Sequence, residues 1–386
     1  MKKLLYIFIL IFTISIQAQT ALFNNGSIQI HDQGQLGFHT NFINNAPFDG
    51  NLGLAGFYGT YTITIAGAFV PQFYDTEIAN EDGVLLSLNI DNTNNTNFIV
   101  GDFRTIKTQS TSYLNFLTNA AYVGSSNFSK VDGYVAITNQ QNFTFPVGDS
   151  EELRPLILNS SNVNSLAKCA YFRENPDNPS SLNTQFNTQQ KPVNIKSIST
   201  REFWRLEGNI NSTVSISWNQ NSQLDLLTDD VNSIVLVGWN KTIRQWINLK
   251  ATNTAGDLTQ GFVTSDTFNP DNYEIITFAS VTNPDDLASN ILTLENYLIT
   301  PNGDGNNDTL VIPELELSPN NTIRIYDRYG LKVYEDVNYT NNFNGFSNVN
   351  STVFGKEKGL PIGVYFYIIT MQDLQMDFQG FMYLAR

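Results

Sequence analysis

Thr213-Val214-Ser215-Ile216-Ser217-Trp218 alternates apolar and polar side chains with a period of two, and this pattern decides the fold class. The same alternation recurs in Tyr61-Thr62-Ile63-Thr64-Ile65 and in Val84-Leu85-Leu86-Ser87-Leu88-Asn89-Ile90. Such runs, closed by Asn, Gly, Asp and Pro, are typical of β-strands joined by turns. After Thr20 no stretch predicts a long amphipathic helix. We therefore expect an all-β protein, with the ring of Trp218 in a core.

The length and composition predict several domains without a helical surface. The chain has 386 residues, more than one hydrophobic core usually serves, so two or three domains are expected. Hydrophobic residues make up 41% of the chain and charged residues 15%, compared with about 25% charged in globular proteins. Asn, Thr, Ser and Gln take the polar positions instead, which favours β-sheet and turns over helices.

Residues 1–18 are typical of a signal peptide. Met1-Lys2-Lys3 is a short positive segment, an uncharged apolar run follows from Leu4 to Ile16, and Ala18 is a small residue suited to cleavage. The run is shorter than the roughly 20 residues that cross a bilayer, although a retained membrane anchor is the alternative. No other stretch predicts a membrane span. The sequence therefore predicts export of the mature chain.

Charge and cysteine content exclude several classes of function. Removal of Lys2 and Lys3 from the 21 basic side chains would leave 19 against 36 acidic ones, a net charge near −17. Such a surface repels nucleic acids and anionic membranes, because phosphate binding needs clustered Lys and Arg. Cys169 is the single cysteine, so an intrachain disulfide and a cysteine zinc site are both excluded.

Residues 19–145 form the first of three regions that differ in amino-acid composition and pattern. Gly, Asn and Phe are frequent in it, in pieces such as Phe42-Ile43-Asn44-Asn45 and Asn94-Asn95-Thr96-Asn97. Asn-rich turns between short strands favour a β-solenoid, in which Asn side chains stack in ladders at the corners. An irregular β-rich sandwich remains the alternative, because no fixed period is measurable.

Residues 146–280 are expected to form a β-sandwich of immunoglobulin-like size. All four Trp residues lie in this region, between Trp204 and Trp246. The runs 233–239 and 243–249 flank Asn240-Lys241-Thr242, which predicts a hairpin. Residues 281–290, with Asn283-Pro284-Asp285-Asp286, are expected to be a linker.

Residues 291–386 are predicted to fold from two hairpins. The first pairs 321–326 with 331–335 around Asp327-Arg328-Tyr329-Gly330, and the second pairs 364–370 with 380–384. The last strand ends within two residues of Arg386, so the chain end is expected to be held in a sheet.

Four ordered blocks of this third region resemble a known family. They are Thr300-Pro301-Asn302-Gly303-Asp304-Gly305-Asn306-Asn307-Asp308, Ile323-Arg324-Ile325-Tyr326-Asp327-Arg328-Tyr329-Gly330, Leu360-Pro361-Ile362-Gly363-Val364-Tyr365-Phe366-Tyr367-Ile368 and Gly380-Phe381-Met382-Tyr383-Leu384-Ala385-Arg386. The region resembles the type B C-terminal sorting domain of the type IX secretion system, also called the gliding motility-associated C-terminal domain. The resemblance covers about a quarter of the chain and implies an immunoglobulin-like β-sandwich. The residues carried over from the family motif are Pro301, Asn302, Gly303, Asp304, Gly305, Asn306, Asp308, Tyr326, Asp327, Arg328, Gly330, Gly363, Tyr365, Tyr367, Gly380, Tyr383 and Arg386.

The sequence departs from the family pattern at three places. Tyr329 stands where the family often has Trp, and Phe343 likewise replaces a Trp before Asn344-Gly345. Asp377-Phe378-Gln379 lacks the basic residue often found before the last strand. Both aromatic replacements keep a ring for packing. The third change leaves open whether a charge contact with the secretion machinery is preserved.

The resemblance implies export across both membranes and placement at the cell surface, associated with the outer membrane, or secretion. It also implies contact with the type IX secretion machinery and with an outer-membrane β-barrel of the PorP/SprF-like family. No direct insertion into the membrane is expected. The domain could be recognised through exposed edge strands, by β-augmentation, or through aromatic anchors, and the sequence leaves both open.

The loop from Asn302 to Asp308 also resembles a calcium loop. Asn302, Asp304, Asn306 and Asp308 place oxygen-bearing side chains at alternate positions around two glycines, and such oxygens suit calcium. A network of Asx turns is the alternative, because Asn and Asp also bond to their own backbone. No other cofactor is expected.

Catalysis is not expected. His31 and His39 are the only histidines and lie too far apart on one strand to share a metal unless the chain bends. Recognised nucleophile, zinc-protease and P-loop motifs are absent from the sequence. The pair Glu151-Glu152 is weak evidence for a glycosidase, because adjacent carboxylates are common in a chain with 36 acidic residues.

Two functions from different classes remain. The first is a non-enzymatic surface protein, exported by the type IX route and held by the barrel partner, which serves surface assembly, adhesion or gliding motility. The second is a secreted glycan-binding module in which Trp204, Trp239 and Trp246 form a stacking platform, with Trp246 as the most exposed ring and Arg244 beside it. Packing of these rings in a sandwich core is the alternative to that platform.

Overall fold

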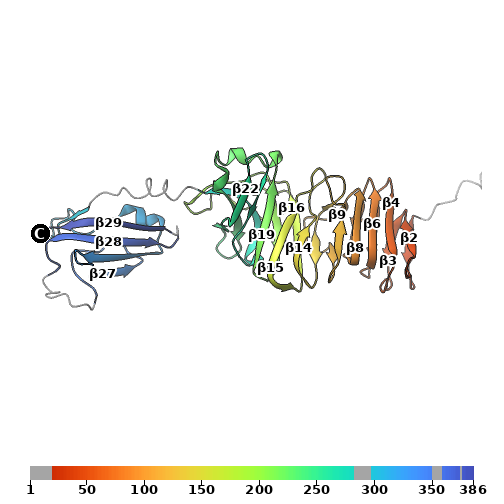
Figure 1. The fold of residues 1–386 in the computed structure, drawn as a ribbon, viewed down its shortest axis with the longest axis horizontal. Coiled ribbons are helices and arrows are strands. Elements are labelled where there is room, and N and C mark those ends of the chain that lie inside the picture. Colours follow the sequence, from red (N-terminus) through yellow and green to blue (C-terminus); the bar gives the residue numbers. More distant parts are fainter. Residues whose placement is uncertain (1–19, 282–296, 350–358, 374–375) are drawn as a thin grey trace, which may run out of the picture. The chain divides into compact units, whose positions relative to one another are not determined.

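The computed structural model describes residues 20–281, 297–349, 359–373 and 376–386 (Figure 1). The expected signal peptide at 1–18 and nearly all of the expected linker at 281–290 lie outside these ranges. The chain divides into two compact units, and the boundary between the first and the second lies near residue 280. Among the described residues, no helix is both long enough and apolar enough to span a membrane. The all-β prediction is confirmed.

The first unit begins as a β-solenoid in which successive strands alternate between two parallel sheets. One sheet has the order β1 (Ala21–Asn24), β3 (Asn41–Asn44), β5 (Ile63–Gly67), β7 (Val84–Leu86), β9 (Phe103–Thr105) and β12 (Val131–Asp132). The other begins with β2 (Gln35–Phe38), β4 (Leu54–Gly59), β6 (Gln72–Asn80), β8 (Ile90–Val100), β10 (Leu114–Phe116) and β13 (Val135–Ile137), and β11 (Ala121–Val123) also pairs with β8. The solenoid alternative for residues 19–145 is therefore the one that the structure shows.

Identical side chains stack from coil to coil inside the solenoid. Asn24 lies in register with Asn44, both are buried, and the Asn24 amide donates to the Asn44 side-chain oxygen at 2.7 Å. Phe38 lies in register with Phe57, and their rings stack at 4.9 Å. These contacts explain why Asn and Phe recur in this region, since each coil buries its inner face only against its neighbours.

The second solenoid sheet continues without interruption into an antiparallel part. Beyond β13 come β16 (Ala167–Phe172), β18 (Phe203–Glu207), β24 (Tyr273–Val281), β20 (Ile234–Asn240) and β21 (Gln245–Asn248). The chain also contains β17 (Ile195–Ile198) and the short 3₁₀ turns η1 (Gln220–Ser222), η2 (Leu224–Leu226), η3 (Val231–Ser233) and η4 (Pro270–Asn272). The predicted hairpin around Asn240 is β20 paired with β21.

A second antiparallel sheet completes the sandwich predicted for the middle region. Its order is β14 (Gln140–Phe145), β15 (Leu156–Asn164), β19 (Ser212–Trp218), β23 (Gly261–Thr264) and β22 (Asn253–Gly256). The two sheets meet where the ring of Trp218 packs edge-on against Phe278 at 5.9 Å. Trp218 is buried, as its alternating stretch predicts.

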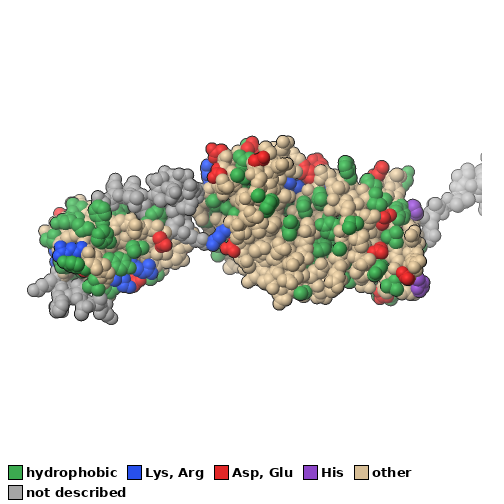
Figure 2. Space-filling model, in the orientation of Figure 1, with side chains coloured by type: hydrophobic (Ala, Val, Ile, Leu, Met, Phe, Trp, Pro, Cys, Tyr) green, Lys and Arg blue, Asp and Glu red, His purple; other side chains and the backbone are tan. Residues whose placement is uncertain are grey.

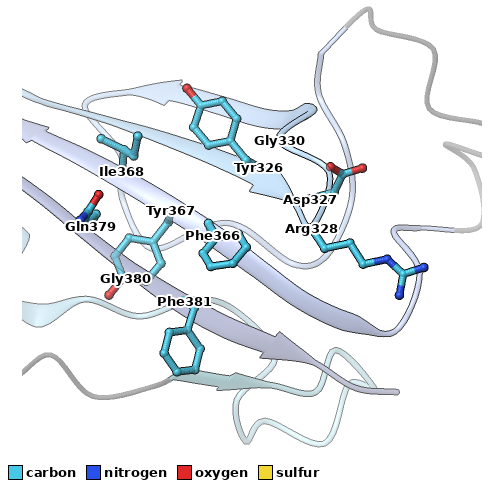
Figure 3. A pocket seen from close by; sticks show the side chains of 10 residues that line it. All are labelled: Tyr326, Asp327, Arg328, Gly330, Phe366, Tyr367, Ile368, Gln379, Gly380 and Phe381. Carbon is cyan, nitrogen blue, oxygen red and sulfur yellow. The ribbon is translucent and has the colours of Figure 1, made fainter.

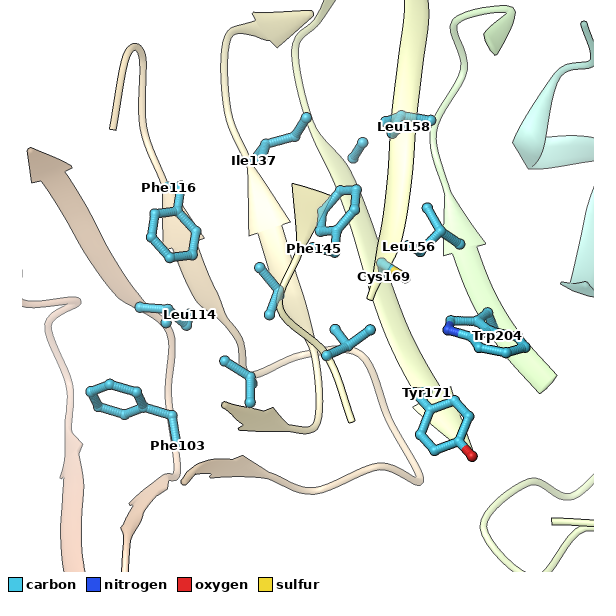
Figure 4. Close-up of a cluster of buried hydrophobic side chains, with 14 of the residues drawn as sticks. Phe103, Leu114, Phe116, Ile137, Phe145, Leu156, Leu158, Cys169, Tyr171 and Trp204 are labelled. Carbon is cyan, nitrogen blue, oxygen red and sulfur yellow. The ribbon is translucent and has the colours of Figure 1, made fainter. Parts of the chain in front are cut away.

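The hydrophobic core does not break at residue 146, where the sequence suggests a domain boundary. One cluster of buried side chains runs from the solenoid into the sandwich, and Figure 4 shows its middle part, from Phe103 and Phe116 through Phe145 to Trp204. Residues 20–190 and 198–279 accordingly form a single compact unit. The architecture changes near residue 146, but solenoid and sandwich share one sheet and one core.

The second unit contains one five-stranded sheet with the order β25 (Tyr297–Ile299), β29 (Met376–Leu384), β28 (Gly363–Met371), β26 (Asn321–Asp327) and β27 (Lys332–Val337). Both predicted hairpins are present as β26–β27 and β28–β29. The described residues of this unit form no second sheet of the kind that an immunoglobulin-like sandwich requires. Instead, η5 (Pro313–Leu317) and loop residues such as Leu310, Tyr339 and Phe343 cover one face of the sheet and form its core.

Candidate docking surface of the C-terminal unit

The five-stranded sheet brings the four sequence blocks that suggested a sorting domain into one unit. Strands β28 and β29 alternate strictly between an inner face, turned to the core, and an outer face turned to solvent. Tyr365 and Tyr367 lie on the inner face and are buried, whereas Tyr383 lies on the outer face and is 45% exposed. The motif residues therefore divide into a structural set and a surface set.

Tyr365, Tyr367 and Gly380 hold the inner face together. The Tyr365 hydroxyl donates to the Pro361 carbonyl at 2.8 Å. Tyr367 lies opposite Gly380 in the β28–β29 register, and its ring lies where a Cβ on residue 380 would project. A glycine inside a strand is thus covered by an aromatic ring from the neighbouring strand, which is a recognised means of supporting such a glycine.

Asp327, Arg328 and Gly330 build the turn between β26 and β27. The Asp327 carboxylate accepts the backbone N–H groups of Tyr329 and Leu331, both at 2.9 Å. Gly330 has φ +81°, a conformation that glycine adopts without strain. The Arg328 guanidinium lies 4.8 Å from the centre of the Tyr329 ring, which is 79% exposed. The turn therefore presents a cation and an aromatic ring together at the surface.

The two aromatic residues that replace family tryptophans have different roles. Phe343 is fully buried and packs against Tyr334 at 4.8 Å, so it belongs to the core. Tyr329 is exposed. At the chain end, the Arg386 guanidinium lies 5.6 Å from the centre of the Phe346 ring.

The loop from Asn302 to Asp308 is held by its own hydrogen bonds. The Asp308 carboxylate accepts three backbone N–H groups, from Asn302 at 3.0 Å and from Gly303 and Gly305 at 2.8 Å each. These bonds lower the pKa of Asp308, because they stabilise its charged form. Gly303 and Gly305 supply the positive φ angles, +82° and +85°, that aim their amides at the carboxylate.

The carboxylate oxygens of this loop point toward N–H groups. Asp304 accepts from the Asn306 backbone at 2.8 Å and from the Asn302 side chain at 3.1 Å, so each carboxylate oxygen of Asp304 and Asp308 accepts an N–H hydrogen bond. Each carboxylate retains further lone pairs, so these bonds do not by themselves exclude a cation at the same oxygens. The loop has the geometry of the Asx-turn network, and calcium binding stays a prediction.

The outer face of the sheet carries an apolar patch beside polar side chains such as Arg324, which lies opposite Ile368. The patch consists of six side chains on β25, β28 and β29, each between 36% and 51% exposed: Leu298, Val364, Phe366, Ile368, Phe381 and Tyr383. Cross-strand registers place Tyr383 between Leu298 and Val364, and Phe366 between Phe381 and Tyr326. Contiguous apolar surfaces of this kind are common at protein interaction sites.

A shallow hollow of about 660 Å³ lies on this outer face (Figure 3). Tyr326, Phe366 and Phe381 stand side by side on neighbouring strands, and Arg328 borders the hollow at the turn, with its guanidinium directed away from Phe366. Most of the outer face was not singled out from the sequence. The signal was present in Val364-Tyr365-Phe366-Tyr367-Ile368, where successive apolar residues place apolar side chains on both faces of one strand.

The edge of the sheet at β27 is closed to strand addition at its centre. The Asn348 side chain accepts the Glu335 N–H at 3.0 Å and donates to the Glu335 carbonyl at 2.7 Å. These are the backbone groups that an added strand would need. Strand addition at the centre of β27 is therefore blocked, whereas the aromatic side chains of the outer face are exposed.

The tryptophans proposed as a sugar platform are buried, which corrects the expectation that Trp246 is exposed. Trp204, Trp239 and Trp246 are each at most 4% exposed. Trp246 packs edge-on against Trp239 at 5.6 Å, and its indole N–H donates to the Asn187 carbonyl at 3.1 Å. Arg244 is exposed in the turn before β21, with φ +54°. A segment distant in sequence covers Trp246, which the alternation of one strand could not reveal.

Comparison with known proteins identifies the C-terminal unit. Residues 292–384 match the family model of the CHU_C type IX secretion signal domain. No curated protein and no solved structure matches the chain. The match includes all five strands of the second unit and the whole outer face. The resemblance drawn from the four sequence blocks is confirmed.

Proposed function

With residues 292–384 as a type IX secretion signal domain, which implies export to the cell surface or release from the cell, we propose that this chain is a non-enzymatic surface protein. In this proposal an outer-membrane β-barrel of the PorP/SprF-like family holds the second unit, and the first unit serves surface assembly, adhesion or gliding motility. The family match carries the proposal. The outer apolar face supplies the surface on which the barrel would dock.

The geometry of the outer face supports anchoring by rings. Phe366 and Phe381 form a cross-strand pair, both are about half exposed, and Arg328 lies beside them. Aromatic and Arg side chains dominate the binding energy of protein interfaces, since they bury much area at low entropic cost. A barrel that presents aromatic or acidic loop residues would complement this set.

The carboxylate pair Glu151-Glu152 supports a structural role over a catalytic one. Glu151 forms an ion pair with Arg173 at 2.7 Å, and Glu152 lies 3.5 Å from the same guanidinium. Glu152 also accepts the side-chain amides of Asn219 and Asn221. Both carboxylates therefore form structural contacts that hold the segment around residues 149–152 in place.

Site-specific photocrosslinking in living cells tests the proposal. A benzophenone amino acid at Phe381 should crosslink to an outer-membrane barrel of the PorP/SprF-like family, because that position lies on the outer face. The matched control is Tyr61, which is 82% exposed in the first unit and outside the docking surface. Equal crosslinking to the barrel from both positions, or none from Phe381 in protein that has reached the surface, would overturn the proposal.

A further inference from the structure

A second candidate site lies on the first unit, on the outer face of the solenoid sheet formed by β2, β4, β6 and β8. A groove of about 710 Å³ follows this face. Its lining includes Gln35, Leu54, Asp75, Glu77, Asn95 and Asn97. The parallel register places Leu54, Asp75 and Asn95 in one row across three strands, and Gly56, Glu77 and Asn97 in the next.

Two aromatic rings beside the groove cover two glycines of the sheet. Gly37 and Gly56 stand opposite each other in the β2–β4 register. The Tyr58 ring occupies the place where a Cβ on Gly56 would project. The His39 ring covers Gly37, with Nε2 3.2 Å from a Cβ position there, and the ring centres of His39 and Tyr58 are 5.7 Å apart. The two rings, whose planes are tilted by 38° to each other, form an aromatic platform over these glycines.

Polar side chains beside the platform are fixed by one another. The Tyr58 hydroxyl donates to one Glu77 oxygen at 2.9 Å, and the Asn97 amide donates to the other at 2.8 Å. Asn94 donates to Asp75 at 2.7 Å in the same way. Burial, then the hydrogen bond to Glu77 and its charge, raise the pKa of Tyr58, so its hydroxyl stays protonated.

Each of these carboxylates retains acceptor capacity, since an ionised carboxylate offers about four lone-pair sites. Aromatic rings held against a sheet, next to hydrogen-bonded acceptors and amides, are suited to a ligand with apolar ring faces and hydroxyl edges. The lining residues include no Lys or Arg, and the chain carries a net charge of −15. Lys and Arg are also sparse on the face of the first unit shown in Figure 2. An anionic ligand would therefore be repelled.

We propose that this groove binds a neutral oligosaccharide, with a sugar ring stacked on Tyr58 and His39 and its hydroxyl groups donating to Glu77 and Asp75. The site is separate from the docking surface on the second unit, and it does not require that a barrel hold the chain. It would give the exported first unit a direct contact with glycan material outside the cell.

Isothermal titration of the full mature chain tests the proposal. The probes are three neutral oligosaccharides, cellohexaose, laminarihexaose and xylohexaose, and one anionic control, hexagalacturonate. Binding of at least one neutral probe is expected, weakened at least about tenfold, which is 1.4 kcal/mol, by Tyr58→Ala and by Glu77→Gln. The Tyr61→Ala variant is the control, because Tyr61 is an exposed tyrosine of the same unit outside the groove.

Circular dichroism and the thermal midpoint show that each variant is folded. If Tyr58→Ala does not fold, Glu77→Gln and Tyr58→Phe still test the proposal. Glu77→Gln is expected to lose affinity for the sugar. Tyr58→Phe is expected to keep the stacking contact and to lose only the hydrogen bond to Glu77. The proposal is overturned if none of the neutral probes binds, if only hexagalacturonate binds, or if Glu77→Gln binds as the parent does. None of these outcomes bears on the barrel partner, which the crosslinking experiment tests separately.

Discussion

The ring of Tyr367 on β28 lies across the backbone of Gly380 on β29, in the place where any larger residue at position 380 would put its Cβ. Both residues belong to the motif that suggested a sorting domain. Tyr367 is buried and also packs against Tyr297 at 6.0 Å, so its ring has little room to move. The pair therefore requires glycine at 380 for a packing reason.

Gly380→Ala is expected to destabilise the C-terminal unit by about 1–3 kcal/mol, because overpacking forces the Tyr367 ring off its place. Chemical denaturation of the purified chain, followed by signals from the second unit, measures the loss. Gln379→Ala, one residue away on the opposite face, is the control and should change stability by less than about 0.5 kcal/mol. Equal stability of Gly380→Ala and the parent would contradict this account of the pair.

The double variant Phe366→Ser, Phe381→Ser is expected to lower the amount of protein at the cell surface without unfolding it. These rings are solvent-exposed, so their loss should cost less than about 1 kcal/mol as a cross-strand pair. Surface labelling of whole cells measures the effect, and Leu226→Ser, at an exposed position of the first unit, is the control. Unchanged surface labelling of the double variant would show that the outer face is not a docking surface.

Glu202→Gln is expected to destabilise the first unit by about 3–5 kcal/mol, because it leaves a buried guanidinium without its counter-charge. Arg154 and Glu202 are each 3% exposed and form two bonds, at 2.7 and 3.1 Å, and Tyr171 donates to the same carboxylate at 2.8 Å. Thermal unfolding by calorimetry measures the loss.

The control for Glu202→Gln is the exposed pair of Lys250 and Asp266, which are 3.7 Å apart. Asp266→Asn should change stability by less than about 0.5 kcal/mol, because solvent screens that pair. If Glu202→Gln behaved like Asp266→Asn, the buried pair of Arg154 and Glu202 would not stabilise the sandwich.

Asp308 is expected to titrate below its ordinary value of 3.8, because three backbone N–H groups stabilise its charge. With a folded pKa lower than the unfolded one, its contribution to the loop is present above the unfolded value and is lost as the pH falls through the folded value. NMR titration of the loop amides measures this. An Asp308 pKa at or above 3.8 would contradict the hydrogen-bond network.

Calcium added in the same NMR experiment separates the two interpretations of the loop. The Asx-turn network predicts unchanged amide shifts at Gly303 and Gly305, whereas a calcium site predicts large shifts, because the cation would bind the carboxylate that accepts these N–H groups.

Features that depend on neighbours in sequence were predictable. The hairpins at Asp327–Gly330 and at Asn240 follow from alternation and turn residues, and the Asn24–Asn44 stack follows from the recurrence of Asn in short coils. The resemblance found four blocks because each keeps its local turn or strand chemistry. Such patterns are encoded within about ten residues and need no knowledge of the rest of the fold.

Features that depend on distant segments were not predictable. Trp246 is covered by the chain near Asn187, so its burial is not visible in the alternation of β21. The core passes residue 146 because β13 pairs with β16, across an intervening hairpin. A strand pattern shows that one face is apolar, but the segment that covers it comes from tertiary structure.

Deletion of residues 291–386 tests whether the C-terminal unit carries this chain out of the cell. Protease accessibility and fractionation of whole cells locate the truncated chain, with the full chain expressed alongside. We expect the truncated chain to stay in the periplasm, protected from added protease, and the full chain to be accessible. Arrival of the truncated chain at the surface in the same amount as the full chain would contradict this expectation.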